Sequence, residues 1–339
     1  MKQRLLSWLA CPVCRSDRLS LEVTRRESRR VPHTLRHADP RSEDEILEGA
    51  LLCADCGRSW PVRDGVPRMR PDGASEGPSS AHRFTNFDAT APVWEESFVE
   101  ALAPIGPDEL LGRVVLDAGC GYGRYTYFAA RAGAEVVALD ASPDAIASAA
   151  DNTRDLHTVH LVEGDLRQPP LRDATFDLVF CIGVLHHLDD PKAAFSALSE
   201  LTRSGGELVV QVYGPRQGAT LIATNALRGA TSSMQPAQLH ALSRGIAAAI
   251  RVGSHTPYRF FGMLPGARGI VTHLPVHDHH QWPFDVVVAD VYDRLRIPVR
   301  HWFTGERLER MFVEAGYADV QVRRRVRNNE TFRGSGTRR

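Results

Sequence analysis

Four cysteines near the N-terminus have the spacing of a metal site. They stand in two C-x-x-C pairs, Cys11-Pro-Val-Cys14 and Cys53-Ala-Asp-Cys56. Two such turns can bring four thiolates to the corners of a tetrahedron, and in a reducing compartment this spacing favours Zn²⁺ over disulfides. Because four thiolates leave no open position for a water, the sequence predicts a structural metal and not a catalytic one.

A glycine-rich loop, Asp117-Ala-Gly-Cys-Gly-Tyr-Gly123, forms the second chemical pattern. It lies between a predicted buried strand, residues 114–116, and a predicted helix, residues 125–132. Glycine permits positive φ and a close approach of the backbone to a ligand, which the first N–H groups of the helix would face. Asp140 ends a second predicted strand, residues 135–139, where its carboxylate can accept from both ribose hydroxyls of a nucleoside.

At this loop the chain resembles the class I S-adenosylmethionine-dependent methyltransferases. Their motif is acid-x-G-x-G-x-G, and residues 117–123 match it in every fixed position. The third glycine comes one residue earlier than in the dinucleotide pattern G-x-G-x-x-G, and an acid leads the loop. The loop thus offers an acceptor for the methionine ammonium and no special provision for a pyrophosphate, although an NAD site remains the alternative for this stretch alone.

Two further strands complete the expected crevice. Residues 158–162 run into Asp165, which the resemblance places at the acceptor of the adenine amino group; a turn-capping Asp is the alternative. Residues 176–188 are similar to the family's F-D-h-V-h-x-x-x-h-L-H-H-h segment. They carry Cys181-Ile-Gly-Val184 where nucleic-acid amino methyltransferases have Asp/Asn-Pro-Pro-aromatic, which argues against a base amine as acceptor. The cofactor-binding residues that the resemblance implies are Asp117, Gly119, Cys120, Gly121, Tyr122, Gly123, Asp140, Ala141, Asp165, Leu166, Cys181 and Ile182.

The order of elements predicts an α/β fold. Strand and helix alternate five times up to residue 212, which is typical of a Rossmann-like, doubly wound parallel sheet. Thr304 is the predicted N-cap of a helix that stops at Gly316, and residues 318–326 and 329–334 then predict an antiparallel hairpin that closes the sheet edge. The methyltransferase domain is expected in residues 93–213 and 301–339.

Residues 1–70 resemble the Trm112-like zinc-ribbon family. A short helix at residues 5–10 leads into the first cysteine pair, and the second pair continues into Gly57-Arg-Ser-Trp-Pro-Val-Arg-Asp-Gly-Val-Pro67. Residues 25–48 are expected to form an exposed loop or an added hairpin, and residues 71–92 a linker. Stand-alone members bind and stabilise methyltransferases, so the fusion implies the same support within one chain. The implied Zn²⁺ ligands are Cys11, Cys14, Cys53 and Cys56.

An insertion, residues 214–300, interrupts the strand and helix rhythm. Helical patterns at 219–227 and 238–250 and aromatic stretches at 258–262 and 273–282 predict a helical and aromatic segment that caps the acceptor site. Its histidines His273, His277, His279 and His280, with Asp278, allow a transition metal, a base for the acceptor, or polar packing against the aromatics. The candidate acid/base residues are His186, His187, His277 and His279.

Composition sets outer limits. The 339 residues are 43% hydrophobic with a formal net charge of zero, so no overall charge attracts nucleic acid, and the C-terminal arginines fit a solvated edge and tail. No apolar run reaches the roughly 18 residues of a membrane helix, and the N-terminus lacks a signal-peptide core. We expect a cytoplasmic protein away from the membrane; the sequence does not predict its oligomeric state.

Together these patterns predict an S-adenosylmethionine-dependent methyltransferase with structural Zn²⁺ and a small-molecule oxygen, carbon or nitrogen acceptor. The acceptor would attack the sulfonium methyl in line, so that catalysis is mostly alignment. One alternative is an RNA-modifying methyltransferase in which the zinc ribbon and basic tail hold the RNA. The other is a scaffold that binds S-adenosylmethionine without turnover.

Overall fold

The computed structural model describes residues 1–31, 41–71, 90–215, 226–231, 233–261, 280–296, 300–325 and 328–339. The chain divides into two compact units. The first takes in the described residues of Met1–Ser79, Ala89–Pro215 and Val299–Arg339, and the second those of Arg216–Pro298. In the part of the chain that the structure describes, no helix is both long enough and apolar enough to span a membrane.

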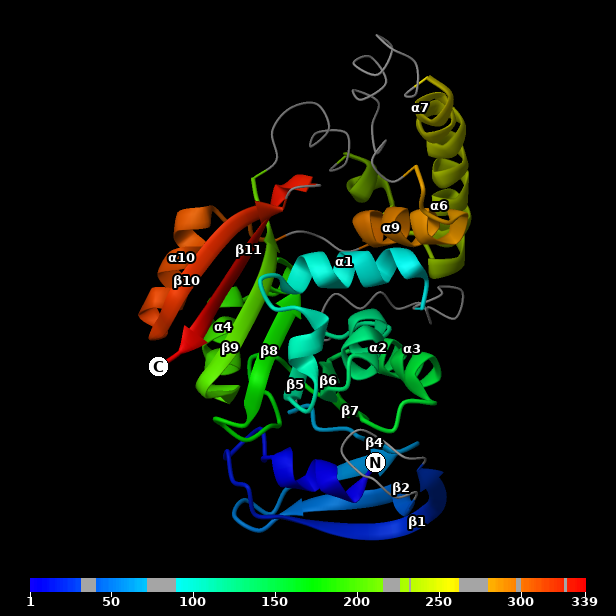
Figure 1. Ribbon diagram of the computed structural model, residues 1–339. Helices are drawn as coiled ribbons and strands as arrows, with labels where there is room; N and C mark the ends of the chain where they lie inside the picture. The colour runs from blue at the N-terminus through cyan, green and yellow to red at the C-terminus, as the bar shows by residue number, and fades with distance from the viewer. Residues whose placement is uncertain are drawn as a thin grey trace. The chain divides into compact units, whose positions relative to one another are not determined.

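The first unit is built on a seven-stranded sheet of order β10-β11-β9-β8-β5-β6-β7 (Figure 1). The five strands from β9 to β7 are parallel, and β11 is antiparallel to both β9 and β10. This sheet confirms the predicted doubly wound fold with its antiparallel closing strand. The strands are β5 (Val114–Ala118), β6 (Glu135–Asp140), β7 (Val159–Glu163), β8 (Phe176–Ile182), β9 (Thr202–Tyr213), β10 (Tyr317–Arg325) and β11 (Asn328–Arg338).

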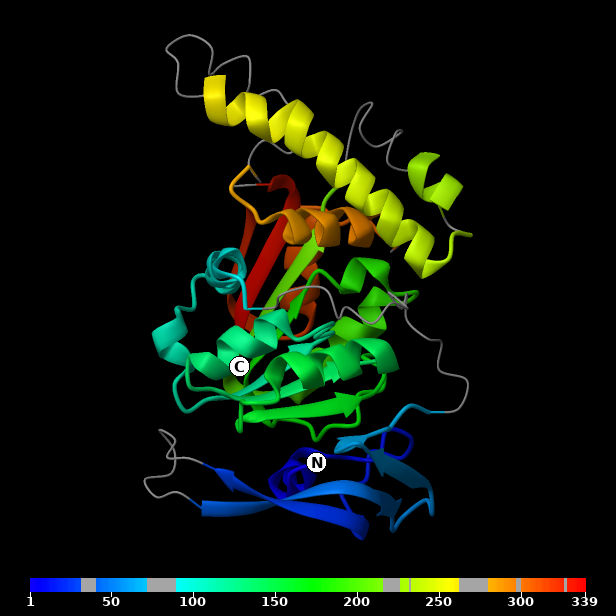
Figure 2. The same ribbon diagram turned by 90° about the vertical axis from the view of Figure 1, so that its right-hand side faces the viewer.

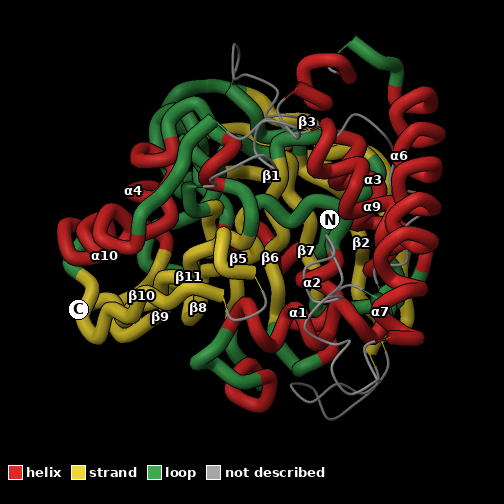
Figure 3. The backbone as a smooth tube through the Cα atoms, turned by 90° about the horizontal axis from the view of Figure 1, so that it is seen from above, coloured by secondary structure: helices red, strands yellow, loops and turns green. Residues whose placement is uncertain are grey.

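Helices cover both faces of this sheet. Figure 3 shows α4 and α10 on one face and α1 and α2 on the other. The Ser142-Pro143 pair predicts a helix start, and Ser142 does cap α3 by accepting from Ala145 N. Thr304 caps α10 by accepting from Arg307 N, as predicted. Gly316 ends α10 with a φ of +82°. The helices are α1 (Pro92–Leu102), η2 (Pro107–Leu110), α2 (Arg124–Arg131), α3 (Pro143–Thr153), η3 (Leu185–His187), α4 (Pro191–Leu201) and α10 (Gly305–Glu314).

Gly205 and Gly206 predict a turn into a strand over residues 207–212, but β9 begins five residues earlier, at Thr202. Thr202 already pairs with Phe176, and the register between β8 and β9 then shifts before Leu178 pairs with Glu207. The predicted turn glycines, Gly205 with a φ of +73° among them, therefore lie in an irregular start of the strand.

The N-terminal residues form a separate four-stranded antiparallel sheet, β1-β2-β3-β4. Its strands are β1 (Leu19–Val31), β2 (Arg41–Cys53), β3 (Ser59–Arg63) and β4 (Val66–Pro67), and a 3₁₀ helix, η1 (Gln3–Trp8), stands where a short helix was predicted. Of the two forms expected for residues 25–48, the described part is the hairpin, since β1 and β2 pair along their length. Figure 2 shows this sheet beyond the β7 end of the main one.

The N-terminal sheet shares its apolar core with the main sheet. Leu5, Leu9 and Trp60 are buried in the same cluster as Leu171 and Phe176. Leu9 forms an isolated antiparallel bridge with Leu171. Because they share this core, the two predicted domains form one compact unit and do not pack independently.

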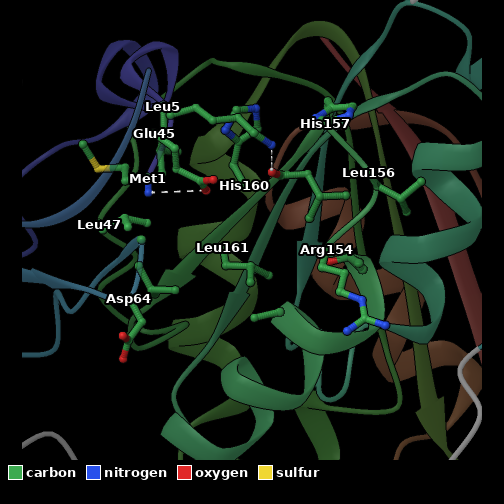
Figure 4. A pocket seen from close by; sticks show the side chains of 16 residues that line it. Met1, Leu5, Glu45, Leu47, Asp64, Arg154, Leu156, His157, His160 and Leu161 are labelled. Carbon is green, nitrogen blue, oxygen red and sulfur yellow. Dashed lines mark hydrogen bonds and ion pairs between the residues drawn. The ribbon is translucent and has the colours of Figure 1, made fainter. Parts of the chain in front are cut away.

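Polar contacts tie the same two parts together. Glu135 Oε1 lies 2.6 Å from His160 Nε2 and 2.9 Å from Arg4 Nε, and the side chains of Glu135 and His160 are fully buried. The Trp8 ring packs edge-on against His160 at 5.1 Å between centroids. A cavity of about 150 Å³ opens beside this contact, with Leu5 and Glu45 on one side and His157 and His160 on the other (Figure 4).

The second unit contains the described part of the insertion. Helix α6 (Pro236–Ile250) continues through a π-helical turn, η4 (Arg251–His255), into α7 (Thr256–Phe261). It packs on α9 (Phe284–Arg296), for which we predicted no element. Most of the helical pattern at 219–227, and His273, His277, Asp278 and His279, lie outside the described residues.

Candidate functional site

The glycine-rich loop has the predicted backbone. Gly119, Gly121 and Gly123 adopt φ values of +84°, +55° and +84° between β5 and α2. A Cβ on Gly119 would lie 2.5 Å from a Val184 methyl, and one on Gly123 would lie 3.1 Å from Ala149. Among the residues that the structure describes, and apart from its two chain neighbours, none has an atom within 4 Å of a Cβ on Gly121. Two glycines thus permit close packing, while the middle one leaves room for a ligand.

Asp117 precedes this loop as a buried carboxyl. Its Oδ2 accepts a hydrogen bond from Thr126 Oγ1 at 2.6 Å. Burial raises its pKa to about 7, the negative charge of Asp140 adds to the rise, and the hydrogen bond from Thr126 opposes it. A cation bound beside Asp117 would favour the charged form, which suits the predicted contact with an ammonium.

Asp140 fastens the loop to the end of β6. Its Oδ2 accepts from Gly121 N and its Oδ1 from Ser142 N, both at 2.9 Å. Burial raises its pKa, and these two N–H groups oppose the rise. Each oxygen keeps a lone pair, so the predicted bonds to two ribose hydroxyls remain chemically possible. Ala141, also predicted to bind the cofactor, lies between Asp140 and Ser142.

Asp165 has a partner that we did not predict. Arg167 donates to it through its backbone N at 2.8 Å and through its guanidinium at 2.6 Å. Burial alone would raise the pKa of Asp165, but the hydrogen bonds and charge of Arg167 outweigh burial and lower it. The Asp-x-Arg spacing of residues 165–167 was the feature of the sequence that could have indicated this pair. Asp165 is therefore a fixed, charged acceptor, and its bond to adenine stays a prediction.

The exit of β8 adds a second open glycine. Cys181 and Ile182 are buried, and burial raises the pKa of the Cys181 thiol far above its usual range, which keeps it neutral. The next residue, Gly183, has a φ of +81°, and in the described part of the chain only its own neighbours come within 4 Å of a Cβ at this position. We did not predict Gly183, although the family pattern places a variable residue there.

The sheet brings these residues to one edge. Asp117 pairs with Ala138 of β6 and Phe180 of β8, and Asp140 pairs with Glu163 of β7. The carboxyl ends of four neighbouring parallel strands therefore meet, which is the usual ligand position in such sheets. Three predicted residues are buried side chains around this edge: Cys120, Tyr122 and Leu166. Cys120 packs in an apolar cluster with Ala138, so its side chain belongs to the core.

Arg124 opens helix α2 beside the loop and was missed. Its guanidinium carbon lies 4.5 Å from the Trp94 ring centroid and 4.6 Å from that of Tyr125. Its positive charge favours the ionised form of Asp117. Its position directly after Gly123 was the signal in the sequence. Through Trp94, helix α1 contacts the start of α2.

The structure separates the two histidines at the β8 exit. His186 is fully buried, and its Nδ1 accepts from Tyr213 N at 3.4 Å. Its carbonyl accepts from Arg300 N and His301 N at 2.9 and 3.1 Å. His187 is half-buried, with its ring centroid 4.0 Å from that of His186. Of the two, His187 is the more accessible as a base. The other two candidates, His277 and His279, lie outside the described residues.

The four predicted metal ligands come together. The Sγ atoms of Cys11, Cys14, Cys53 and Cys56 all lie within 4.8 Å of one another, and none of these cysteines forms a disulfide. The Cys11–Cys56 and Cys14–Cys53 sulfur distances are 3.6 and 3.5 Å. A tetrahedral ion with bonds of about 2.3 Å would place its sulfurs about 3.8 Å apart, so the donor set and geometry fit a metal.

Family models match both parts of the first unit. Residues 116–210 match the methyltransferase domain family, and residues 2–65 match the Trm112p-like protein family. The chain thus has one segment similar to Trm112p-like proteins and one similar to methyltransferase domains. These matches confirm the two family resemblances that were found in the sequence.

Curated relatives resemble the methyltransferase domain. The ubiquinone biosynthesis O-methyltransferase of Xanthomonas euvesicatoria is 34% identical over 122 residues, which cover 34% of this chain and 49% of that protein. Its namesake from Xylella fastidiosa is 30% identical over 160 residues, covering 43% and 63%. The chain thus spans between about half and two thirds of these relatives. Among solved structures, the magnesium protoporphyrin IX methyltransferase of Synechocystis is 16% identical with a TM-score of 0.41, covering 73% of this chain and 83% of that one.

Proposed function

We propose that this chain is an S-adenosylmethionine-dependent methyltransferase with a small-molecule acceptor that is methylated on oxygen. The Asp140–Gly121 contact at an open glycine carries the proposal, because it sets a fixed carboxylate beside backbone with room for a nucleoside. The O-methyltransferases among the relatives support oxygen as the accepting atom.

In this proposal each of three acidic residues binds a different part of the cofactor. Asp117 would hold the methionine ammonium, Asp140 the ribose hydroxyls and Asp165 the adenine amino group. Ile182 and Gly183 would line the space beside the sulfonium. When bound, S-adenosylmethionine supplies an activated methyl group. The remaining task of the chain is to align an acceptor oxygen with that methyl and to exclude water.

A hydroxyl acceptor also requires a proton acceptor. His187 is half-buried at the β8 exit and is the described histidine best placed for this role. His277 and His279 of the insertion remain candidates from the sequence. We further propose that residues 214–300 cap the acceptor site, since they follow β9 directly and interrupt an otherwise regular fold.

The Trm112-like domain is proposed to hold structural Zn²⁺. Four thiolates at tetrahedral spacing favour Zn²⁺ and leave no position for a substrate. A cytoplasmic location is consistent with cysteines kept as thiolates.

Binding and transfer are tested separately. Calorimetric titration should give one S-adenosylmethionine site per chain, and labelled cofactor should then methylate a member of a panel of phenols and catechols. A panel of tRNA and rRNA fragments in the same assay tests the competing acceptor class. Transfer to RNA alone, with affinity that falls steeply with salt, would contradict the proposal. Tight cofactor binding without transfer to any acceptor would support the scaffold instead.

A further inference from the structure

The last strand of the Trm112-like domain reaches the edge of the main sheet at the cofactor site. Arg68, directly after β4, forms a parallel bridge with Glu163 at the end of β7. Met69 N donates to the Glu163 carbonyl at 2.8 Å. Val66 of β4 packs in the same apolar cluster as Cys120 of the glycine-rich loop. The N-terminal domain therefore pairs with β7 and shares an apolar cluster with the loop.

Glu163 connects this contact to Asp140. The two acids are paired residues on neighbouring parallel strands, so their side chains leave the same face of the sheet. Glu163 is 8% exposed, and Arg68 Nη1 lies 2.5 Å from its Oε2. Burial raises the pKa of Asp140, and the negative charge of Glu163 adds to that rise. A Glu163 without its arginine would oppose the charged form of Asp140 more strongly.

We propose that Arg68 is a positioning residue for the cofactor: by neutralising Glu163 it keeps Asp140 charged, so that Asp140 can hold Gly121 and accept from the ribose. The Trm112-like domain then contributes a positive charge to the cofactor site, in addition to covering apolar surface of the methyltransferase domain. Arg70 acts in the same sense, since its positive charge favours the ionised form of Asp165. This inference rests on the proposed function, which assigns Asp140 to the cofactor.

Arg15 provides a matched control for a purely structural role. It also fastens the Trm112-like domain to the methyltransferase domain, since its guanidinium donates to Pro169 O at 2.6 Å and Leu171 O at 3.0 Å. Its acidic partner is Asp173, which is exposed and belongs to none of the strand ends that form the site. Loss of Arg15 should weaken docking without adding charge beside Asp140.

The experiment titrates the full chain with S-adenosylmethionine and S-adenosylhomocysteine at pH 7.5. Arg68→Gln should weaken both affinities on the order of tenfold, within the usual range of coupling between sites. Arg15→Gln and Arg68→Lys should stay within about threefold of the wild type, because neither leaves Glu163 unneutralised. The double variant Arg68→Gln/Glu163→Gln should recover most of the lost affinity, since it removes the charge that Arg68 offsets. Thermal unfolding of each variant shows whether it is folded.

Several outcomes would overturn the inference. If the double variant binds as weakly as Arg68→Gln, or if Arg15→Gln weakens binding equally, Arg68 is only a docking contact. Should Arg68→Gln fail to fold, a double variant that folds and binds supports the electrostatic role, and one that also fails to fold contradicts it. Absence of binding in the wild type would instead contradict the proposed function. Binding that depends on Asp140 but not on Arg68 contradicts this inference alone.

Discussion

The imidazole of His186 stacks on the ring of Tyr213 with 4.0 Å between centroids, and its Nδ1 accepts from the Tyr213 backbone N–H. Tyr213 is the last residue of β9, directly before the insertion. The His186 carbonyl accepts from the backbone N–H of Arg300, the last residue of the insertion, and from that of His301, the residue after it. His186 thus joins both ends of the insertion to the exit of β8, which is a different role from the acid/base chemistry proposed from the sequence.

Variants of His186 separate the two roles. His186→Phe keeps a stacking ring but leaves the Tyr213 N–H without its acceptor, whereas His186→Asn keeps an acceptor. We expect His186→Phe to lower the free energy of unfolding by about 1 to 3 kcal/mol and His186→Asn to lower it less. Denaturant unfolding measures this difference, and hydrogen exchange should be faster at the Tyr213 amide only in His186→Phe. Equal stabilities with turnover lost in both variants would restore His186 as a base.

Removal of the Asp140 carboxylate should weaken cofactor binding. Asp140→Ala loses the acceptor for Gly121 N–H and for the ribose hydroxyls, a loss of about 1 to 3 kcal/mol. Calorimetric titration with S-adenosylmethionine measures it, with Asp144→Ala, in the first turn of α3, as a control. Unchanged affinity would show that the carboxylate at the end of β6 does not contact the cofactor.

The Asp117 pKa predicts a pH dependence. This carboxyl titrates near 7 when folded and near 3.8 when unfolded, so the folded state holds its proton more tightly. Its contribution to stability is present at low pH, is lost as pH rises from about 4 to 7, and is flat above that. Asp117→Asn should therefore lose less stability between pH 5 and 7.5 than the wild type, by a difference on the order of a few kcal/mol. Parallel pH curves for the two proteins would contradict the raised pKa.

Cofactor binding should respond to the same group with the opposite sign. The methionine ammonium favours the charged form of Asp117, so binding below pH 7 should release a proton and affinity should rise from pH 5.5 to 7.5. Titration in buffers of different ionisation enthalpy counts that proton. In Asp117→Asn the release should vanish, and a release that persists would have to come from another group.

Loss of one metal ligand should unfold the N-terminal domain locally. Cys53→Ser removes one of four thiolates, and because metal binding adds free energy to the local folding of the residues that hold the ion, stoichiometric zinc should be lost. Metal analysis of the purified protein tests this, with Cys181→Ser, a buried cysteine away from the cluster, as the control. Wild-type protein with four reduced thiols and no zinc would contradict the metal site.

Much of the main sheet was predictable because buried parallel strands are continuous aliphatic runs. The predicted strand at 135–139 is β6 to within one residue, and the capped helix after Ser142 begins where its Ser-Pro start indicated. Helix α9 had no such signal. Its consecutive valines, Val286 to Val288, favour strand, and packing against α6 overrides that preference.

The contacts that give neighbouring site residues different roles could not be predicted from the sequence. His186 and His187 are adjacent and alike in type, and only the 3₁₀ turn of η3 buries one and leaves the other half-accessible. Arg68 and Glu163 lie 95 positions apart, so their pairing depends on how two domains dock. Local patterns predict elements and loops, whereas such long-range pairs follow from tertiary packing.

The junction at Tyr213 also shows where the chain could accept a different insertion. Phe303 N donates to Tyr213 O at 3.0 Å, so the chain leaves the methyltransferase domain and returns to it at nearly the same point. A segment with adjoining ends can be shortened, lengthened or replaced without altering the span that the sheet must close. The interval between Tyr213 and Phe303 is therefore a natural graft site, at which a foreign cassette could be inserted while the cofactor half of the fold is left intact.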